Sequence, residues 1–378
     1  MSELLVIRNA DVYAPEPLGL RDVLIGGGRV LAIEARIDAI AGPGVATLEL
    51  EGRRLVPGFV DSHVHLTGGG GESGPASRVP RLPFRDLVSA GVTTAIGVLG
   101  TDGTTRTVES LVSAVQALRE QGLSAWCFTG SYEIPPITLT GSVRKDIVYV
   151  DPIIGVGEVA ISDHRSSQPT FDELAKLAAD CHVAGMMSGK AGLLHLHLGD
   201  GPRGLSLVRR ILDETEIPAA TFYPTHLNRR TALFKEGIEI ASRGCPMDVT
   251  AFPVEEGEDA YDAAEAITRY LDSGAPRHLI TCSSDGGGCL PKFDASGRLI
   301  AMDVGRPAVL FETFAALLTR GCALADALPV FTKNPADILR LPRKGRITVG
   351  ADADFVVLDE KHHPRDVIAL GRPLNEKI

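Results

Sequence analysis

The chain has 378 residues, of which 44% are hydrophobic and 23% charged, a composition that suits a folded protein with a sizeable core and excludes intrinsic disorder. Lys and Arg number 38 against 48 Asp and Glu, and the resulting net charge of -10 disfavours nucleic acid or an anionic membrane surface as a partner. The length allows for one large domain and a smaller one.

Both ends of the chain consist of short β-rich segments interrupted by glycine. They span residues 4–13, 22–25 and 28–33 at the N-terminal end, and 345–350 and 353–358 at the C-terminal end. The chain between them has a different character. We therefore expect the two ends to join in one small β-sandwich domain of residues 1–54 plus 342–378.

The middle of the chain, residues 55–341, alternates apolar strand candidates with amphipathic helical stretches. Strands are predicted at 55–61, 94–99, 125–129, 153–160, 193–197, 220–225, 247–252 and 279–283, and helices at 107–120, 171–184, 204–214, 228–243 and 261–273. Strand–helix alternation of this length predicts an α/β fold, a (β/α)8 TIM barrel. An open doubly wound sheet is the alternative, disfavoured because no glycine-rich phosphate-binding pattern follows the first strand.

Metal-ligand side chains stand where the predicted barrel strands end. His63 and His65 follow the first strand in the sequence DSHVH. Because alternate residues of a strand face the same way, both imidazoles point into one space. His197, His226 and Asp285 close three later strand candidates. One such histidine is more often a packed core residue, but the whole set at one end of a barrel favours a divalent-metal site.

Two sequence blocks resemble the amidohydrolase superfamily: VPGFVDSHVH at 56–65, and TKNPA at 332–336 followed by residues 344–359. Within that superfamily the chain is similar to the isoaspartyl (β-aspartyl) dipeptidases. This narrower resemblance rests on GGGGE at 68–72, GSY at 130–132, AISDHR at 160–165, HLGD at 197–200, THLNR at 225–229 and SSDG at 283–286. Together these motifs cover nearly the whole chain.

The resemblance implies two zinc ions per subunit. His63, His65 and Asp285 would hold the first ion, and His197 and His226 the second. The same ligand types also suit Mn, Fe or Co.

The bridging ligand departs from the family pattern. The resemblance implies a carbamylated lysine seven residues before Arg165, and that position is Glu158. A glutamate is also a monoanion with two oxygens, although it is shorter. We predict that Glu158 bridges two metals directly and that activity needs no bicarbonate; a mononuclear or impaired site is the alternative. Lys190 precedes the fifth strand and is expected at the wrong end of the barrel.

The expected reaction is hydrolysis of a peptide or amide bond, because a hydroxide shared by two metal ions is a nucleophile at neutral pH. Asp285 is the predicted general base and acid. The resemblance assigns Tyr132 to stabilising the tetrahedral oxyanion. A tyrosine packed in a loop is the alternative interpretation of Tyr132.

The resemblance also implies the substrate contacts. Glu72 matches the residue that binds a free α-ammonium, and Arg165 and Arg229 match guanidinium groups that bind carboxylates. Thr101 is a further candidate. Cys289 stands where the family tends to have a serine that touches the substrate carboxylate. One cation site and two anion sites describe a β-aspartyl dipeptide.

Two further histidines are given no role in the predicted site. His164 and His195 are predicted not to be metal ligands, and His195 is expected to pack in the core. The six cysteines are scattered rather than paired at short spacing, and we predict that they are buried thiols.

The leading hypothesis is a metal-dependent dipeptidase whose partner is a small dipeptide. With no signal-peptide pattern and no apolar run long enough to span a membrane, we expect it in the cytoplasm. The family favours homo-oligomers. One alternative is a hydrolase of another small amide, such as an N-acyl amino acid or a cyclic amide. Another is a metal-free barrel used as an assembly module, which the retained metal-ligand residues argue against.

Overall fold

The computed structural model describes residues 4–40, 42–293 and 299–374. A sheet of parallel strands in the order β11-β10-β9-β8-β7-β6 forms its centre. The bounds of these strands are β6 Phe59–Val64, β7 Val92–Gly97, β8 Ser124–Thr129, β9 Ile153–Ile161, β10 Leu193–Leu198 and β11 Phe222–Thr225.

A second parallel pair completes the set of predicted barrel strands. β12 (Met247–Thr250) pairs with β13 (Ile280–Ser283), and β12 lies beside β11 while β13 lies beside β6. A parallel bridge between Val64 and Gly286 continues the contact of β13 with β6. The central domain is therefore TIM-barrel-like, as the strand–helix alternation predicts.

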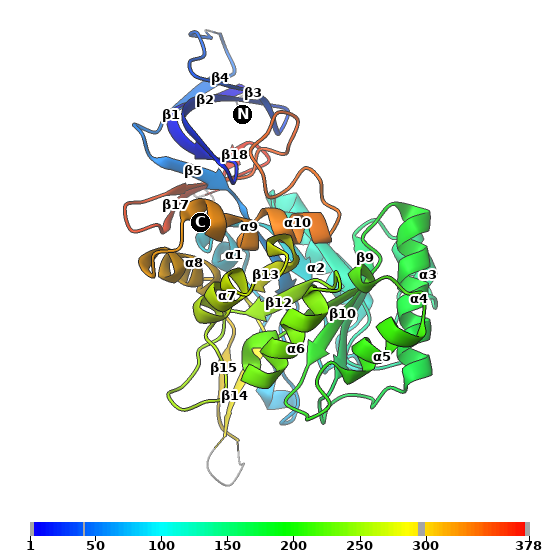
Figure 1. Cartoon of the computed structure of the whole chain (residues 1–378). Helices are drawn as coiled ribbons and strands as arrows, with labels where there is room; N and C mark the ends of the chain where they lie inside the picture. Colours follow the sequence, from blue (N-terminus) through cyan, green and yellow to red (C-terminus); the bar gives the residue numbers. More distant parts are fainter. Residues whose placement is uncertain (1–3, 41, 294–298, 375–378) are drawn as a thin grey trace.

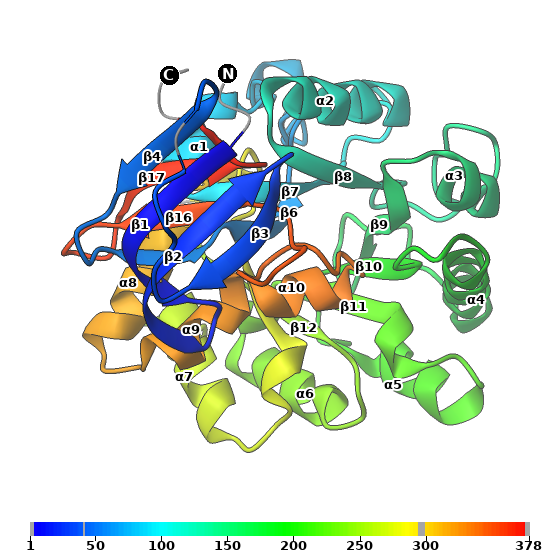
Figure 2. The ribbon, with the colours of Figure 1, turned by 90° about the horizontal axis from the view of Figure 1, so that it is seen from above.

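Helices surround these strands on the outside (Figure 2). Their bounds are α1 Phe84–Ser89, α2 Val108–Gln121, α3 Val143–Tyr149, α4 Phe171–Ser188, α5 Ser206–Glu214, α6 Thr231–Ala241, α7 Ala263–Asp272, α8 Val309–Thr319, α9 Leu324–Phe331 and α10 Lys333–Ile338. Short 3-10 turns lie at Pro75–Ser77, Ala219–Thr221, Leu227–Arg229 and Arg277–Leu279.

The sequence explains where the predicted helices start. Thr107 and Thr170 cap α2 and α4 with capping boxes, which satisfy backbone N–H groups that lack a partner within the helix. Apolar residues at three- and four-residue steps face the strands, as along α2 from Val108 to Leu118. Within the described ranges, no helix is both long and apolar enough to cross a membrane.

Strands from both ends of the chain pair in one sheet, drawn at the top of Figure 1. The order is β18-β17-β16-β5-β1-β2-β3, and β4 pairs with β1. The bounds are β1 Leu4–Tyr13, β2 Pro17–Gly26, β3 Arg29–Glu34, β4 Val45–Glu49, β5 Arg54–Pro57, β16 Phe355–Leu358, β17 Pro364–Ala369 and β18 Arg372–Pro373.

The terminal sheet has a hydrophobic core of its own, in which Ile7 and Val12 pack with Phe355 and Ile368. The sandwich form and the boundaries 1–54 plus 342–378 stay predictions. The outer ends of that domain, 1–3 and 375–378, lie outside the described residues.

The prediction of a single strand at 55–61 is wrong. The segment is divided at Gly58 into β5, which joins the terminal sheet, and β6, which joins the barrel. A side chain at Gly58 would lie 2.1 Å from Thr93 Oγ1, so only glycine fits where the chain passes from one sheet to the other.

The β character predicted for 345–350 is also wrong. This segment contains no strand and forms only isolated backbone hydrogen bonds, such as Gly350 N to Val30 O at 2.9 Å. Its conformation follows from Gly345, where the backbone has a φ of 66° and a Cβ would lie 2.2 Å from Thr332 O. The buried Lys344 just before it bonds Asp354 at 2.7 Å and Asp352 at 2.9 Å.

A hairpin that the sequence pattern did not predict projects from the lower end of the molecule in Figure 1. It consists of β14 (Cys289–Phe293) and β15 (Leu299–Val304), which pair antiparallel. Cys289, a predicted substrate contact, is its first residue. The hairpin thus follows closely after Asp285, which itself comes two residues after the end of β13.

Candidate metal centre

Six predicted metal-ligand side chains meet at the C-terminal ends of the barrel strands. They are His63, His65, Glu158, His197, His226 and Asp285. His226 and Asp285 have left-handed backbones, with φ of 63° and 51°. Residues other than glycine rarely adopt this region, and those that do gather at functional sites.

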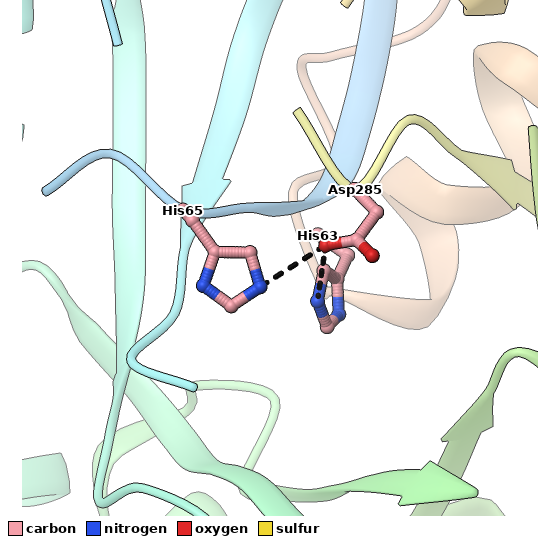
Figure 3. Close-up of side chains that lie close together, drawn as sticks. All are labelled: His63, His65 and Asp285. Carbon is pink, nitrogen blue, oxygen red and sulfur yellow. Dashed lines mark ion pairs between the residues drawn. The ribbon is translucent and has the colours of Figure 1, made fainter. Parts of the chain in front are cut away.

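Asp285 joins the two histidines of the first strand (Figure 3). His65 Nε2 lies 3.0 Å from Asp285 Oδ1, and His63 Nε2 lies 3.5 Å from the same oxygen. Within the described ranges, neither His63 Nε2 nor Asp285 Oδ1 has a hydrogen-bond partner, although both atoms are buried. Two imidazoles and a carboxylate with buried, unused lone pairs fit a divalent cation.

Glu158 lies between this group and the remaining histidines. Its Oε1 is 3.3 Å from His65 Nε2 and 3.5 Å from His63 Nε2. Its Oε2 is 3.0 Å from His197 Nδ1 and 3.6 Å from His226 Nε2. Each carboxylate oxygen therefore faces a different pair of imidazoles, which is the arrangement a ligand bridging two cations requires.

The electrostatics of the centre favour positive charge. Burial alone would raise the pKa of Glu158, but the charges of His63 and His197 hold it well below its ordinary value. Burial alone would lower the pKa of His65, but Asp285 and Glu158 raise it to about 9. The centre thus keeps Glu158 anionic and draws protons to His65, and a divalent cation would supply the same positive charge.

His195 does more than the core packing that the sequence predicts. It stacks on Phe128 with ring centroids 5.0 Å apart, so the packing is present. Its Nδ1 also lies 2.8 Å from Tyr223 O, and its Nε2 lies 2.7 Å from His63 Nδ1. A carbonyl only accepts, so His195 donates through Nδ1 and accepts from His63 through Nε2. In the neutral ring that a metal would require, this leaves the lone pair on His63 Nε2, the nitrogen that faces Glu158 and Asp285.

Replacing His195 with leucine is expected to weaken metal binding by about 10- to 100-fold, because His63 then loses the partner that orients its ring. His195→Gln should lose much less, because its amide oxygen can accept the same hydrogen bond. Competition with a chelating dye would measure the affinity, and Tm would report folding. His278→Leu, at an exposed histidine, is the matched control. Equal losses in the leucine and glutamine variants would contradict a positioning role.

Tyr132 and Asp163 approach His197 from outside the cluster. Tyr132 Oη lies 2.8 Å from His197 Nδ1, and Asp163 Oδ2 lies 3.2 Å from His197 Nε2. Burial raises the pKa of Tyr132 well above its ordinary value, so its hydroxyl stays a donor. Arg165 donates to Asp163 at 2.8 Å and lies over the Tyr132 ring.

The predicted substrate residues gather around Glu72. Thr101 Oγ1 donates to Glu72 Oε1 at 3.0 Å, and Arg165 Nη1 lies 3.5 Å from the same oxygen. Cys289 Sγ lies 3.4 Å from Glu72 Oε1. Burial and the charge of Glu72 raise the pKa of the Cys289 thiol to about 12, which keeps it protonated. Glu72 and Arg165 therefore form one oppositely charged pair beside the histidine cluster.

The structure also places two further residues from the sequence analysis, Arg229 and Lys190. Arg229 donates to Leu198 O at 2.6 Å and pairs with Asp200 at 3.2 Å, and its Nη1 lies 3.4 Å from His197 Nε2. Lys190 donates to Val150 O at 2.7 Å and to Ile153 O at 3.0 Å, at the start of β9. The prediction that Lys190 lies at the opposite end of the barrel is confirmed.

Two acidic residues near the centre were missed as site residues. Asp163 belongs to the SDHR motif and contacts His197, and Asp61 precedes the two histidines of the DSHVH motif. Asp61 accepts from the backbone N–H of Ser284 at 3.1 Å, and so holds the segment before Asp285. Burial raises the pKa of Asp61 to about 7. Both residues lie within the SDHR and DSHVH motifs, and this placement was the sequence signal that could have identified them.

Comparison with known families agrees with this geometry. Residues 54–377 match the model of the amidohydrolase family. Curated relatives include an allantoinase from Enterococcus faecalis, 22% identical over 95% of this chain and 87% of its own length. A deacetylase from Agrobacterium fabrum is 24% identical over 89% of this chain and 78% of its own.

Solved structures give a narrower similarity. A β-aspartyl dipeptidase from Fervidobacterium islandicum AW-1, in complex with the β-Asp-Leu dipeptide, is 41% identical and has a TM-score of 0.93, over 99% of this chain and 96% of that one. An L-hydantoinase from Arthrobacter aurescens is 15% identical with a TM-score of 0.70, covering 99% of this chain and 96% of that one, and shares the fold.

Proposed function

The chain belongs to the amidohydrolase family, and from this premise we propose that it is a metal-dependent dipeptidase that hydrolyses β-aspartyl dipeptides. The observation that carries the proposal is the Glu72–Arg165 pair, 3.5 Å apart, beside the cluster of histidines and carboxylates. The 41% identity to a β-aspartyl dipeptidase over almost the whole chain supports the same substrate class.

The charges around Glu72 suit the N-terminal half of a β-aspartyl dipeptide. That half carries an α-ammonium and an α-carboxylate on one carbon atom, while its side chain forms the scissile amide. Glu72 can bind the ammonium and Arg165 the carboxylate, so the substrate would replace their contact with each other. Arg229 would bind the carboxylate of the leaving residue. Thr101 and Cys289, both within reach of Glu72, would complete this end of the site.

The metal centre is proposed to hold two Zn²⁺ ions. His63, His65 and Asp285 would bind one ion and His197 and His226 the other, with Glu158 between them in place of a carbamylated lysine. When bound, such ions lower the pKa of a water molecule and polarise a carbonyl group. The mixture of imidazole and carboxylate ligands is suitable for zinc.

The chain's own groups would handle the proton and the developing charge. Asp285, anionic beside two imidazoles, can accept the proton of the attacking water and return it to the leaving amine. Tyr132, kept protonated by burial, can donate a hydrogen bond to the carbonyl oxygen as negative charge grows on it. Asp163 would orient His197 through its contact with Nε2, and Arg165 would orient Tyr132 by packing on its ring.

A substrate panel tests the proposal against the cyclic-amide and N-acyl alternatives. Turnover of β-Asp-Leu is expected to exceed that of dihydroorotate, hydantoin and N-acetyl-leucine by at least about 100-fold in kcat/KM, since only the dipeptide carries the matching ammonium and carboxylates. Glu72→Gln should raise KM for β-Asp-Leu by about 100-fold. Glu120→Gln, on the exposed face of α2, is the matched control.

Two results would contradict the proposal. One is faster hydrolysis of a cyclic amide than of β-Asp-Leu. The other is a Glu72→Gln variant with unchanged KM. Protein that binds no metal would instead favour the assembly-module alternative.

A further inference from the structure

We propose that a cavity beside the start of α2 is a binding site for a phosphate group, separate from the proposed dipeptide site. The cavity has a volume of about 360 Å³. The side chains used below are Arg78, Arg81, Arg106, Thr67, Ser110 and Ser113, all of which line it. No carboxylate is among the described residues that line this cavity.

Arg106 is the fixed element of the site. Its Nη2 donates to Gly69 O at 2.7 Å and to Val79 O at 3.1 Å, and its Nη1 donates to Thr67 O. The side chain is only 7% exposed, so its charge is held in one place inside the protein. Its Nε is buried and has no hydrogen-bond partner among the described residues, since the carboxylate oxygen that it faces, Asp102 Oδ2, is 3.9 Å away. A buried donor without a partner is costly, and a bound oxyanion would supply one.

The positive charge around the cavity exceeds the negative charge. Arg78 and Arg106 share one carboxylate, Asp102, and each lies 3.9 Å from its Oδ2. Arg81 forms no ion pair within the part of the chain that the structure describes. Three guanidinium groups line the cavity beside the carboxylate of Asp102, and the charge of Glu72 also acts on Arg106, so the excess around the cavity is positive. Burial and the nearby charge of Arg78 lower the pKa of Arg106, which indicates that these groups repel one another.

The polar groups of the cavity suit phosphate better than a carboxylate. A phosphate group offers more oxygens than a carboxylate and can meet several guanidinium groups at once. Thr67 Oγ1 is buried without a hydrogen-bond partner among the described residues and can donate to it. Ser113, in the second turn of α2, offers a further hydroxyl, whereas the Ser110 hydroxyl already donates to Thr107 O at 2.7 Å.

The cavity adjoins the proposed active site without sharing its ligands. Arg106 bonds the carbonyls of Thr67 and Gly69, in the loop that leads from the first histidines to Glu72. None of the six proposed metal ligands, and neither Arg165 nor Arg229, lines the cavity. A phosphate here would therefore be a second ligand and would not be a competitor for the dipeptide contacts.

Calorimetric titration of the metal-loaded protein with inorganic phosphate, at constant ionic strength in chloride buffer, tests the site. We expect one phosphate per chain, with a Kd at least tenfold weaker in Arg81→Ala and in the double variant R78A/R81A. Arg85→Ala is the matched control, because Arg85 is exposed on α1 and does not line the cavity, and it should bind like the wild type. Tm establishes that each variant is folded. Ribose 5-phosphate serves as a second probe, and its Kd relative to that of inorganic phosphate shows whether the site prefers an esterified or a free phosphate.

Glu158→Gln separates this site from the metal centre. Phosphate held at the metal ligands would be lost in E158Q and kept in R78A/R81A, and that result would overturn the proposal. The absence of phosphate binding beyond that of chloride would overturn it as well. Neither outcome bears on β-aspartyl hydrolysis, because Arg78 and Arg81 take no part in the proposed dipeptide site.

Discussion

Replacing Glu158 with glutamine is expected to lower kcat/KM for β-Asp-Leu by about 10³-fold and to reduce the bound metal from two equivalents to one or none. Glu158 is the group whose two oxygens face both pairs of imidazoles, at 3.0 to 3.6 Å. Glutamine keeps the size but removes the buried negative charge, a change that typically costs about 3–5 kcal/mol where the partners are charged. Elemental analysis and steady-state kinetics measure the two effects.

A second variant at position 158, together with metal reconstitution, distinguishes a glutamate bridge from a carbamylated lysine. Glu158→Ala should regain activity with added formate or acetate, because a small carboxylate can occupy the space of the missing side chain. Wild-type protein stripped of metal should recover fully on adding Zn²⁺ without bicarbonate. Glu120→Gln is the control for the general effect of removing an acidic group. Two retained metals in E158Q, or a strong dependence on bicarbonate, would refute a bridging role.

Asp285→Asn is expected to lower kcat for β-Asp-Leu by about 10³-fold, within the range for losing a general acid–base group. Burial alone would raise the pKa of Asp285, but His63 and His65 hold it well below its ordinary value, so the native side chain is ionised at neutral pH and can accept a proton. Asparagine can neither accept that proton nor deliver it to the leaving amine. Stopped assays with β-Asp-Leu, and Tm for folding, measure the change.

A second substrate with a different leaving group shows whether Asp285 transfers a proton to the leaving amine or only binds metal. β-Aspartyl p-nitroanilide has a far better leaving group, whose departure depends less on proton delivery by a general acid, so Asp285→Asn should impair its hydrolysis less than that of β-Asp-Leu. Asp272→Asn, at the exposed end of α7, is the matched control. Equal losses on both substrates would show that Asp285 does not deliver the proton to the leaving amine.

Local patterns were sufficient for most of the barrel. Amphipathic periodicity located α2 and α4 to α7 with ends within four residues of those observed, because each helix buries one apolar face against the strands. Apolar runs located β7 to β13 because parallel strands covered by helices are buried on both faces. The meeting of His63, His197 and Asp285 was predictable because parallel strands in a barrel end on the same side.

Features that depend on distant partners could not be predicted in this way. Nothing local in residues 55–61 indicates that Leu55 pairs with Val357, so the division at Gly58 was missed. The contact of His195 with His63 joins two strands 132 positions apart. The pairing of Asp163 with His197 likewise depends on how β9 and β10 align. Sequence spacing gives the direction of a side chain but not its neighbour across the barrel.

The continuity of β5 with β6 through Gly58 ties the terminal sheet to the strand that leads into His63 and His65. β5 pairs with β16, so that Pro57 lies opposite Phe355, 298 positions later. β6 pairs with β7 and β5 also pairs with β1, but the pairing of β5 with β16 can form only after Phe355 has been made. Contacts so distant in sequence also close late in folding. We therefore expect the segment that joins the two sheets, and leads to His63 and His65, to reach its final position late in folding, when the terminal sheet closes.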